Sequence, residues 1–295
     1  MLARDLDTTV PLRRPPTADD VSAPFLADFE IVRLVGGGGM GVVFEARHHV
    51  HGHRVALKFH RQGAMPVDQA RARLLHEARV MARLRHPNVV TLLDVGNAAD
   101  EIFIVMELIE GGTLRDWMRE PHDWRDVVDM FIAFGHGLAK AHALGLVHRD
   151  VNPSNVFVDR DGTPKLGDFG LAVSSDAPDL DDASRLTAPG GVLGTPGYMA
   201  PELRCGGRAD ARSDQYAFCA SLHEAVSGAQ PELGVALAVP RPLRAALSRG
   251  LATDPQARFP SMNALFAALW RARRRRSRSV VHAVSDASTT LTYGA

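Results

Sequence analysis

Residues 148–170, HRDVNPSNVFVDRDGTPKLGDFG, contain two acidic motifs with a gap between them that fits a short hairpin. Asp150 ends the first motif, Asn155 lies five residues after it, and Asp168 begins the triplet DFG. One carboxylate for the proton of a hydroxyl group, with an amide oxygen and a second carboxylate for a hard cation, is what magnesium-assisted phosphoryl transfer requires. The order and spacing therefore predict chemistry on a phosphoryl group.

A glycine cluster lies upstream of these motifs, between two runs of β-forming residues. FEIVRLV starts at Phe29 and VVFEARH starts at Val42, so the two runs predict a hairpin. Gly36, Gly38 and Gly41 have the spacing GxGxxG, which lets backbone N–H groups approach a phosphate without interference from a Cβ atom. A dinucleotide-binding fingerprint should open a helix, whereas a strand follows here. The prediction is a glycine hairpin over a phosphate, and a flexible turn is its alternative.

The next predicted strand, HRVALKFH, places Lys58 17 residues after Gly41. An apolar strand of this kind can aim an ammonium group at phosphate oxygens, and a lysine on a solvated strand edge is the alternative. Glu77 lies in a predicted helix over residues 66–86. If this helix packs against the strand, Glu77 pairs with Lys58 and fixes its position; otherwise Glu77 belongs to a solvated charged face.

In this order the motifs resemble those of the protein kinase superfamily. The resemblance covers residues 29–270 and includes Ala200-Pro201-Glu202, which is similar to the motif that closes the activation segment of kinases. GGGGMGVVFEA, HPNVV and GTPGYMAPE are most similar to bacterial, eukaryotic-like Ser/Thr kinases. The resemblance implies an α+β, bilobal kinase fold, with a small β-rich lobe that carries one regulatory helix and a larger, mainly α-helical lobe. Thr195 within GTPGYMAPE implies specificity for Ser and Thr.

The expected domain organisation follows the changes of pattern along the chain. The kinase domain is expected over residues 29–272, with the small lobe at about 29–107 and the large lobe at about 110–272. A flexible segment over residues 1–28 precedes it, and a basic tail over 273–295 is predicted to be disordered.

Within the large lobe, helical patterns are expected along WRDVVDMFIAFGHGLAKAHALG from Trp124 and near residues 212–227, 240–252 and 261–272. LVHRD, NVFV and PKLGDFG are predicted as strand-like pieces.

The resemblance also implies roles for single residues. Asp150 would accept the proton of the substrate hydroxyl, while Asn155 and Asp168 would hold Mg²⁺, with Mn²⁺ as a possible substitute. Lys58, paired with Glu77, would contact the phosphates of ATP. The residues expected to line the ATP site are Val35, Gly36, Gly37, Gly38, Gly39, Met40, Gly41, Val43, Ala56, Lys58, Met106, Glu107 and Ile109.

Further residues match structural positions of the family. Backbone groups of Glu107 and Ile109 would meet adenine, in a hinge that follows Met106. Asp214 resembles the helix-buried aspartate that holds the backbone of the His-Arg-Asp motif. Another pair, Glu202 with Arg258, resembles the structural ion pair of the large lobe.

Position 152 departs from the family, because Asn152 stands where Ser/Thr kinases usually carry lysine. A neutral side chain cannot offset γ-phosphate charge, and losing one such cation costs about 2–4 kcal/mol of transition-state stabilisation. The sequence offers no substitute cation at Ser154, so we expect an active but slowed kinase. The alternative is a pseudokinase that acts as a nucleotide-binding scaffold. A small-molecule phosphotransferase fits less well, because GTPGYMAPE is intact.

Regulation is expected at Arg149, since an arginine before the catalytic aspartate can bind a phosphate on the activation loop. The candidate acceptors in that loop are Thr187, Ser184, Ser174 and Ser175.

Composition limits the classes of partner and compartment. The 295 residues carry 34 Lys and Arg against 34 Asp and Glu, so a wholly basic nucleic-acid binder is not expected. Two cysteines exclude a disulfide framework and favour the cytoplasm, and the absence of an apolar run of about 18 residues predicts no transmembrane span. Protein substrates, ATP and self-association for autophosphorylation are the expected partners. Six arginines between 271 and 278 are expected to form a solvated tail, a truncated juxtamembrane remnant or a site for anionic lipid or nucleic acid.

Overall fold

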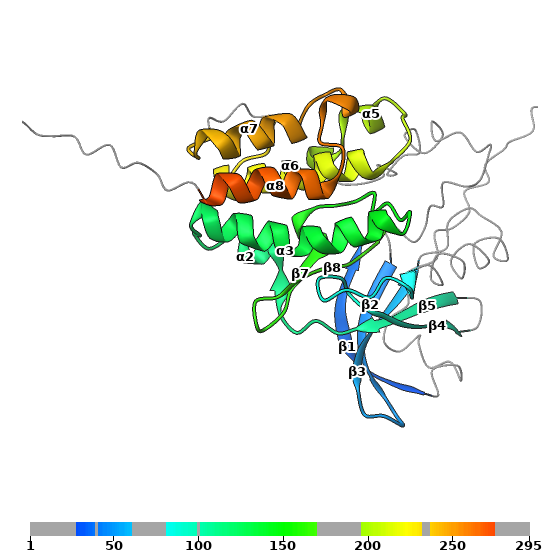
Figure 1. Cartoon of the computed structure of the whole chain (residues 1–295). Coiled ribbons are helices and arrows are strands. Elements are labelled where there is room, and N and C mark those ends of the chain that lie inside the picture. Colours follow the sequence, from blue (N-terminus) through cyan, green and yellow to red (C-terminus); the bar gives the residue numbers. More distant parts are fainter. Residues whose placement is uncertain are drawn as a thin grey trace, which may run out of the picture.

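The computed structural model has a β-rich part and a helical part. The β-rich part lies below the helical part in Figure 1. The structure describes residues 28–38, 41–60, 81–98, 101–169, 196–231 and 237–274. Along these ranges, no helix has both the length and the apolar character that crossing a bilayer requires.

A five-stranded antiparallel sheet makes up the small lobe, with the strand order β1-β2-β3-β5-β4. Its strands are β1 (Phe29–Gly38), β2 (Gly41–His48), β3 (Arg54–His60), β4 (Leu92–Ala98) and β5 (Glu101–Glu107). The predicted hairpin is confirmed, because β1 and β2 pair on either side of the glycine cluster. Strand β4 was not predicted, since LLDVGNA contains Asp, Gly and Asn, which are depleted in strands.

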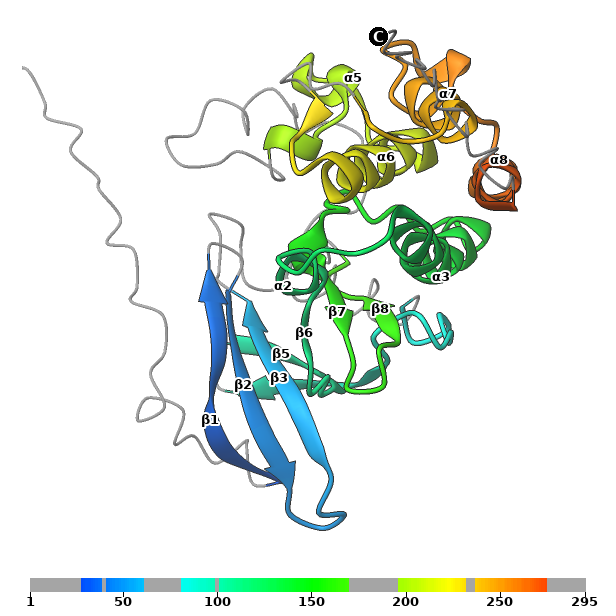
Figure 2. The ribbon, with the colours of Figure 1, turned by 90° about the vertical axis from the view of Figure 1, so that its left-hand side faces the viewer.

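Long helices dominate the large lobe, and Figure 2 shows them stacked at the far side from the five-stranded sheet. The helices are α2 (Leu114–Trp117), α3 (Trp124–Ala143), α5 (Pro201–Arg204), α6 (Ala211–Ser227), α7 (Arg241–Gly250) and α8 (Met262–Arg274). Short 3-10 helices are η2 (Pro153–Asn155), η3 (Pro196–Tyr198) and η5 (Pro255–Ala257). Helix α3 packs on α6 and α8 through an aromatic core of Phe131, Phe134, Phe218 and Phe266.

Two expectations for this lobe need correction. LVHRD is not a strand, because Arg149 has a φ of 72°, in the left-handed region that a strand excludes. The long C-terminal helix ends at Arg274 rather than at residue 272, and Arg273 forms an ion pair with Asp129 of α3. Arg273 and Arg274, the first two residues of the predicted basic tail, therefore belong to α8.

A second, small sheet lies where the two lobes meet. Its strands are β6 (Gly112–Thr113), β7 (Val156–Val158) and β8 (Pro164–Leu166), in that order. Residues 88–90, which lead into β4 of the small lobe, pair with β8: the Val90 N–H donates to the Leu166 carbonyl, and the Leu166 N–H donates to the Asn88 carbonyl, both at 2.9 Å. Backbone of one lobe is therefore hydrogen-bonded to backbone of the other.

Helix α3 approaches this junction closely at one glycine. A Cβ atom at Gly137 would lie 2.5 Å from the Asn88 carbonyl oxygen, which is too short for a real contact. Glycine at this position therefore lets α3 pack directly against residues 88–90.

Candidate active site

Lysine and aspartate from different lobes meet at the predicted phosphoryl-transfer site. Lys58 of β3 places its Nζ 2.6 Å from Oδ1 of Asp168, and the lysine side chain is only 8% exposed. Asp168 has a φ of 52°, which turns the chain sharply after β8. The strand lysine and the DFG aspartate, 110 residues apart in sequence, therefore share one place between the lobes. Glu77, the predicted partner of Lys58, lies outside the described residues.

Asp150 and Asn155 form a second pair of predicted site residues. The Asn155 side-chain nitrogen donates to the backbone carbonyl and to Oδ2 of Asp150, both at 2.8 Å. Because the Asn155 amide nitrogen is engaged with Asp150, its oxygen Oδ1 is the atom that suits a cation. The pair thus holds the Asp150 carboxylate in one orientation.

His148 joins the two acidic motifs to each other. Its Nε2 lies 2.7 Å from the Gly167 carbonyl, and a carbonyl only accepts, so Nε2 carries the proton. Nδ1 is then free to accept the Asp150 N–H, at 3.3 Å. The imidazole is fully buried and its ring centre lies 4.6 Å from that of Phe169. These contacts fix the loop of Asp150 relative to the loop of Asp168.

Asp214 of α6 holds the backbone of residues 148–155, the predicted catalytic loop. Its Oδ2 accepts the His148 N–H at 2.7 Å, and its Oδ1 accepts the Arg149 N–H at 2.8 Å. His142 of α3 adds a third contact, with Nε2 2.8 Å from Oδ2. The expected role of Asp214 is thus seen in the contacts, whereas His142 was missed, because no local motif marks it.

Asn152 has a structural role that the comparison of charges alone did not reveal. The side chain is buried; its oxygen accepts the Ser154 N–H at 2.9 Å, and its nitrogen donates to the Asp150 carbonyl at 3.2 Å. Asn152 is therefore the N-cap of η2. Asparagine is among the preferred N-cap residues and Pro153 follows it, so the signal was present in the sequence.

The register of the small-lobe sheet collects several predicted ATP-site residues on one face. Val43 lies opposite Lys58, and Ala56 lies opposite Met106. Side chains two residues apart on a strand share a face, so these four residues face the same side. Val43 also lies opposite Gly36, which places the glycine hairpin at the end of the same row.

For other residues expected to line the ATP site, the structure gives only their position in the sheet. Gly37, Gly38 and Gly41 lie in the hairpin, and Val35 is an exposed residue of β1. Gly39 and Met40 fall outside the described residues. All of these assignments remain predictions.

Glu107 directs its side chain toward the large lobe. The carboxylate accepts the Thr91 N–H at 2.7 Å and the Lys165 ammonium group at 3.1 Å. The Glu107 N–H itself donates to the Thr91 carbonyl at 3.0 Å. The Glu107 side chain and N–H are thus engaged within the protein, and the assignment of backbone groups of Glu107 and Ile109 to a nucleotide base stays a prediction.

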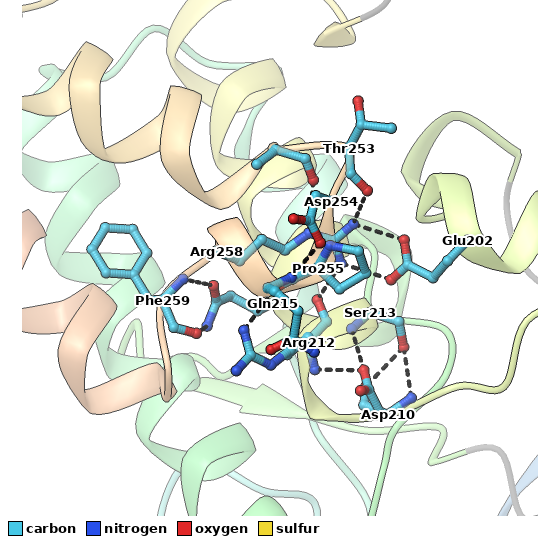
Figure 3. A network of polar contacts seen from close by, with 12 residues as sticks. Glu202, Asp210, Arg212, Ser213, Gln215, Thr253, Asp254, Pro255, Arg258 and Phe259 are labelled. Carbon is cyan, nitrogen blue, oxygen red and sulfur yellow. Dashed lines mark hydrogen bonds and ion pairs between the residues drawn. The ribbon is translucent and has the colours of Figure 1, made fainter.

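The predicted ion pair of Glu202 and Arg258 is present and bidentate, with both N–O distances at 2.7 Å (Figure 3). Arg258 is 1% exposed and also donates to the carbonyls of Ala252 and Arg212, both at 2.9 Å. The pair therefore ties the end of the GTPGYMAPE segment to the base of α6 and the loop before α8.

Comparison with known proteins agrees with this geometry. Residues 29–235 match the family model described as "Protein kinase domain". Serine/threonine-protein kinase pkn3 of Myxococcus xanthus is 36% identical over 230 residues, which are 75% of this chain and 41% of that protein. The DNA damage-responsive serine/threonine-protein kinase RqkA of Deinococcus radiodurans is 39% identical over 212 residues, 70% of this chain and 30% of that protein. The chain thus spans less than half the length of these relatives.

Solved structures give the same result over a whole domain. The PknI kinase domain of Mycobacterium tuberculosis has a TM-score of 0.63 and 30% sequence identity, and the match covers 83% of this chain and 96% of that one. The fold, the placement of Lys58, Asp150, Asn155 and Asp168, and these similarities lead to one conclusion. The chain belongs to the protein kinase family and is similar to its bacterial-type Ser/Thr members.

Proposed function

We propose that this chain transfers the γ-phosphoryl group of ATP to Ser or Thr hydroxyl groups of protein substrates. The observation that carries the proposal is the contact between Lys58 of the small lobe and Asp168 of the large lobe, next to the loop of Asp150. A phosphate-directed cation, a carboxylate for a metal ion and a carboxylate for a hydroxyl proton are thereby assembled at one place.

The residues present fit a nucleotide with magnesium. Mg²⁺ uses one or two carboxylates together with phosphate oxygens and water, so the Asp168 carboxylate and the Asn155 amide oxygen form a suitable donor set. No group of three or more His, Cys, Asp or Glu that could hold a metal ion occurs in the described part of the chain. When bound, the metal–nucleotide complex supplies the phosphoryl group and offsets its charge.

The chain's own residues position the acceptor. Asp150, oriented by Asn155, accepts a hydrogen bond from the substrate hydroxyl and takes its proton as that oxygen attacks the γ-phosphorus, while the bond from this phosphorus to ADP breaks and ADP leaves. Lys58 holds phosphate oxygens, and the glycine hairpin covers them with backbone N–H groups. Catalysis in this arrangement is mostly positioning and charge stabilisation.

Arg149 supports a further part of the proposal, phosphorylation of the activation loop. Its Nη1 is buried and finds no hydrogen-bond partner among the residues that the structure describes. A phosphate is a strong acceptor for such a group. The candidate acceptors Thr187, Ser184, Ser174 and Ser175 lie outside the described residues, and self-association of two chains for this reaction is part of the proposal.

The decisive experiment supplies the purified chain with Mg²⁺, ATP labelled at the γ-phosphate and a general protein substrate. We expect label on Ser or Thr, and we expect Asp168→Ala to lower incorporation at least about 1,000-fold, because the metal-binding carboxylate is lost. Asp161→Ala is the matched control: this carboxylate is exposed in the β7–β8 turn and should leave incorporation unchanged. Binding of ATP without any transfer would overturn the proposal in favour of a nucleotide-binding scaffold.

Substitution of Asn152 by lysine should raise kcat by restoring a cation near the γ-phosphate, at a small cost in stability. Lysine cannot accept the Ser154 N–H, and loss of an N-cap costs about 1 kcal/mol. Steady-state kinetics and urea unfolding measure the two effects separately. A kcat that stays the same or falls would show that this loop does not lack a cation.

A further inference from the structure

An arginine that the proposed transfer reaction does not use lies beside the catalytic loop. Arg115 of α2 donates from Nε to the hydroxyl oxygen of Ser154, at 3.0 Å. Ser154 is exposed, and its own N–H is held by Asn152, whose amide group also reaches the Asp150 carbonyl. Arg115 therefore brings a positive charge to Ser154, which lies four residues after Asp150.

The other side of the Arg115 guanidinium faces Tyr198 and Glu224. It donates to the Tyr198 hydroxyl, and its Nη1 lies 3.4 Å from Oε1 of Glu224. The Tyr198 hydroxyl donates in turn to Oε2 of Glu224. Both oxygens of this carboxylate are thus engaged, and the arginine carbon Cζ lies 5.8 Å from the centre of the tyrosine ring. A second basic side chain at Glu224 would therefore lie close to the positive charge of Arg115 and would have to share the carboxylate with it.

Arg115 nevertheless keeps capacity for a ligand. A guanidinium has five N–H groups, and the contacts with Ser154, Tyr198 and Glu224 use three of them. Its side chain is 38% exposed, so, as far as the described residues go, two N–H groups remain for a partner from solution. Charge-assisted bonds from arginine to a carboxylate are among the strong hydrogen bonds of proteins.

The position of Arg115 places it within reach of a bound substrate. The acceptor hydroxyl must lie at Asp150, and Ser154 follows within a 3-10 turn, which is more compact than extended chain. Tyr198 lies in η3, at the end of the activation segment, so Arg115 bridges the two segments that flank the acceptor. An extended peptide covers about 3.4 Å per residue, so side chains within a few positions of the acceptor can contact Arg115.

We propose that Arg115 determines substrate specificity: it favours Ser or Thr acceptors with an acidic side chain a few residues away, and it disfavours a basic side chain there, because the guanidinium repels a second positive charge and already pairs with Glu224. The inference rests on the proposed function as a Ser/Thr protein kinase. It concerns the choice of substrate and leaves the roles of Asp150 and Asp168 unchanged.

The test compares peptides that share one acceptor and differ only in neighbouring residues, which are acidic, neutral or basic. For the unmodified chain we expect kcat/KM to be highest for the acidic peptide. Arg115→Ala should lower kcat/KM for the acidic peptide about 10-fold, mainly through a higher KM. It should leave kcat/KM for the neutral peptide within about 2-fold and raise kcat/KM for the basic peptide. Arg119→Ala is the matched control, because Arg119 is an exposed neighbour on the same segment, paired with Asp116. It should not change the order of preference.

Two outcomes would overturn the inference. One is an equal loss on all three peptides, which is what a merely structural role of Arg115 produces. The other is an unmodified chain that does not prefer the acidic peptide. Fluorescence anisotropy with the same peptides, labelled, measures binding without turnover. A chain that binds the acidic peptide through Arg115 but transfers no phosphate refutes the proposed function and retains the recognition site.

Discussion

Replacing Asp214 by alanine should lower the free energy of unfolding by about 3–5 kcal/mol and reduce phosphoryl transfer about 100-fold. The carboxylate is 2% exposed and accepts the N–H groups of His148 and Arg149. Each buried N–H that loses its acceptor costs about 1–3 kcal/mol. Arg149 is also held in the left-handed region, at a φ of 72°, a strain of about 1–3 kcal/mol that Asp214 offsets.

The loss of transfer follows from the same contacts. Without Asp214 the loop relaxes, and Asp150, which follows Arg149 directly, no longer meets the acceptor hydroxyl correctly; a misplacement of about 1 Å can cost 100-fold in rate. Urea unfolding and labelled-phosphate transfer measure the two effects.

Asp210 provides the control for this experiment. It lies on the same helix, as the N-cap of α6, and its carboxylate also accepts two backbone N–H groups, those of Arg212 and Ser213. Because Asp210 is exposed, Asp210→Ala should cost only about 1 kcal/mol and leave transfer unchanged. Equal losses in the two variants would contradict the assigned role of Asp214.

The Glu202→Ala variant should lose about 3 kcal/mol of stability, because Arg258 then keeps its charge in a buried position without a counter-ion. Gln in place of Glu202 should lose less, since one amide oxygen still accepts from Arg258. Combining Glu202→Ala with Arg258→Met removes the buried charge, so the double variant should lose less than the sum of the two single losses. Thermal and urea unfolding give these values.

An exposed ion pair is the appropriate reference for Glu202. Arg119→Ala breaks the ion pair with Asp116, in which the Arg119 side chain is 74% exposed and the Asp116 side chain 46% exposed. This variant should change the free energy of unfolding by less than about 0.5 kcal/mol. If Glu202→Ala changes the free energy of unfolding as little as Arg119→Ala does, water reaches Arg258 and the ion pair does not stabilise the fold.

Residues that act through a short motif could be predicted from sequence, and residues that act through distant contacts could not. The spacing of Asp150 and Asn155 corresponds to a direct hydrogen bond in the structure. His142 and Arg115 lack any such marker, because their partners lie 72 and 83 residues away, at Asp214 and Tyr198. Only the packing of α3 against α6, of α6 against η3 and of α2 against η2 brings these groups together.

Secondary structure was predictable for the same reason. The apolar periods of α3, α6 and α8 are local and gave their positions closely. LVHRD appeared strand-like because of its apolar residues, but a carboxylate from another helix fixes its backbone in a conformation that no local pattern encodes. Strand β4 shows the reverse case, in which pairing with β5 imposes a strand on residues that do not favour one.

The hydrogen bonds between residues 88–90 and β8 add a second attachment to the one that the chain itself makes after Glu107. These two attachments of the backbone define a line, and rotation of the lobes about this line leaves both of them intact. Lys58 and Asp168 lie on opposite bodies. We expect the two lobes to admit a nucleotide between them by rotating relative to each other about this axis, and not by sliding.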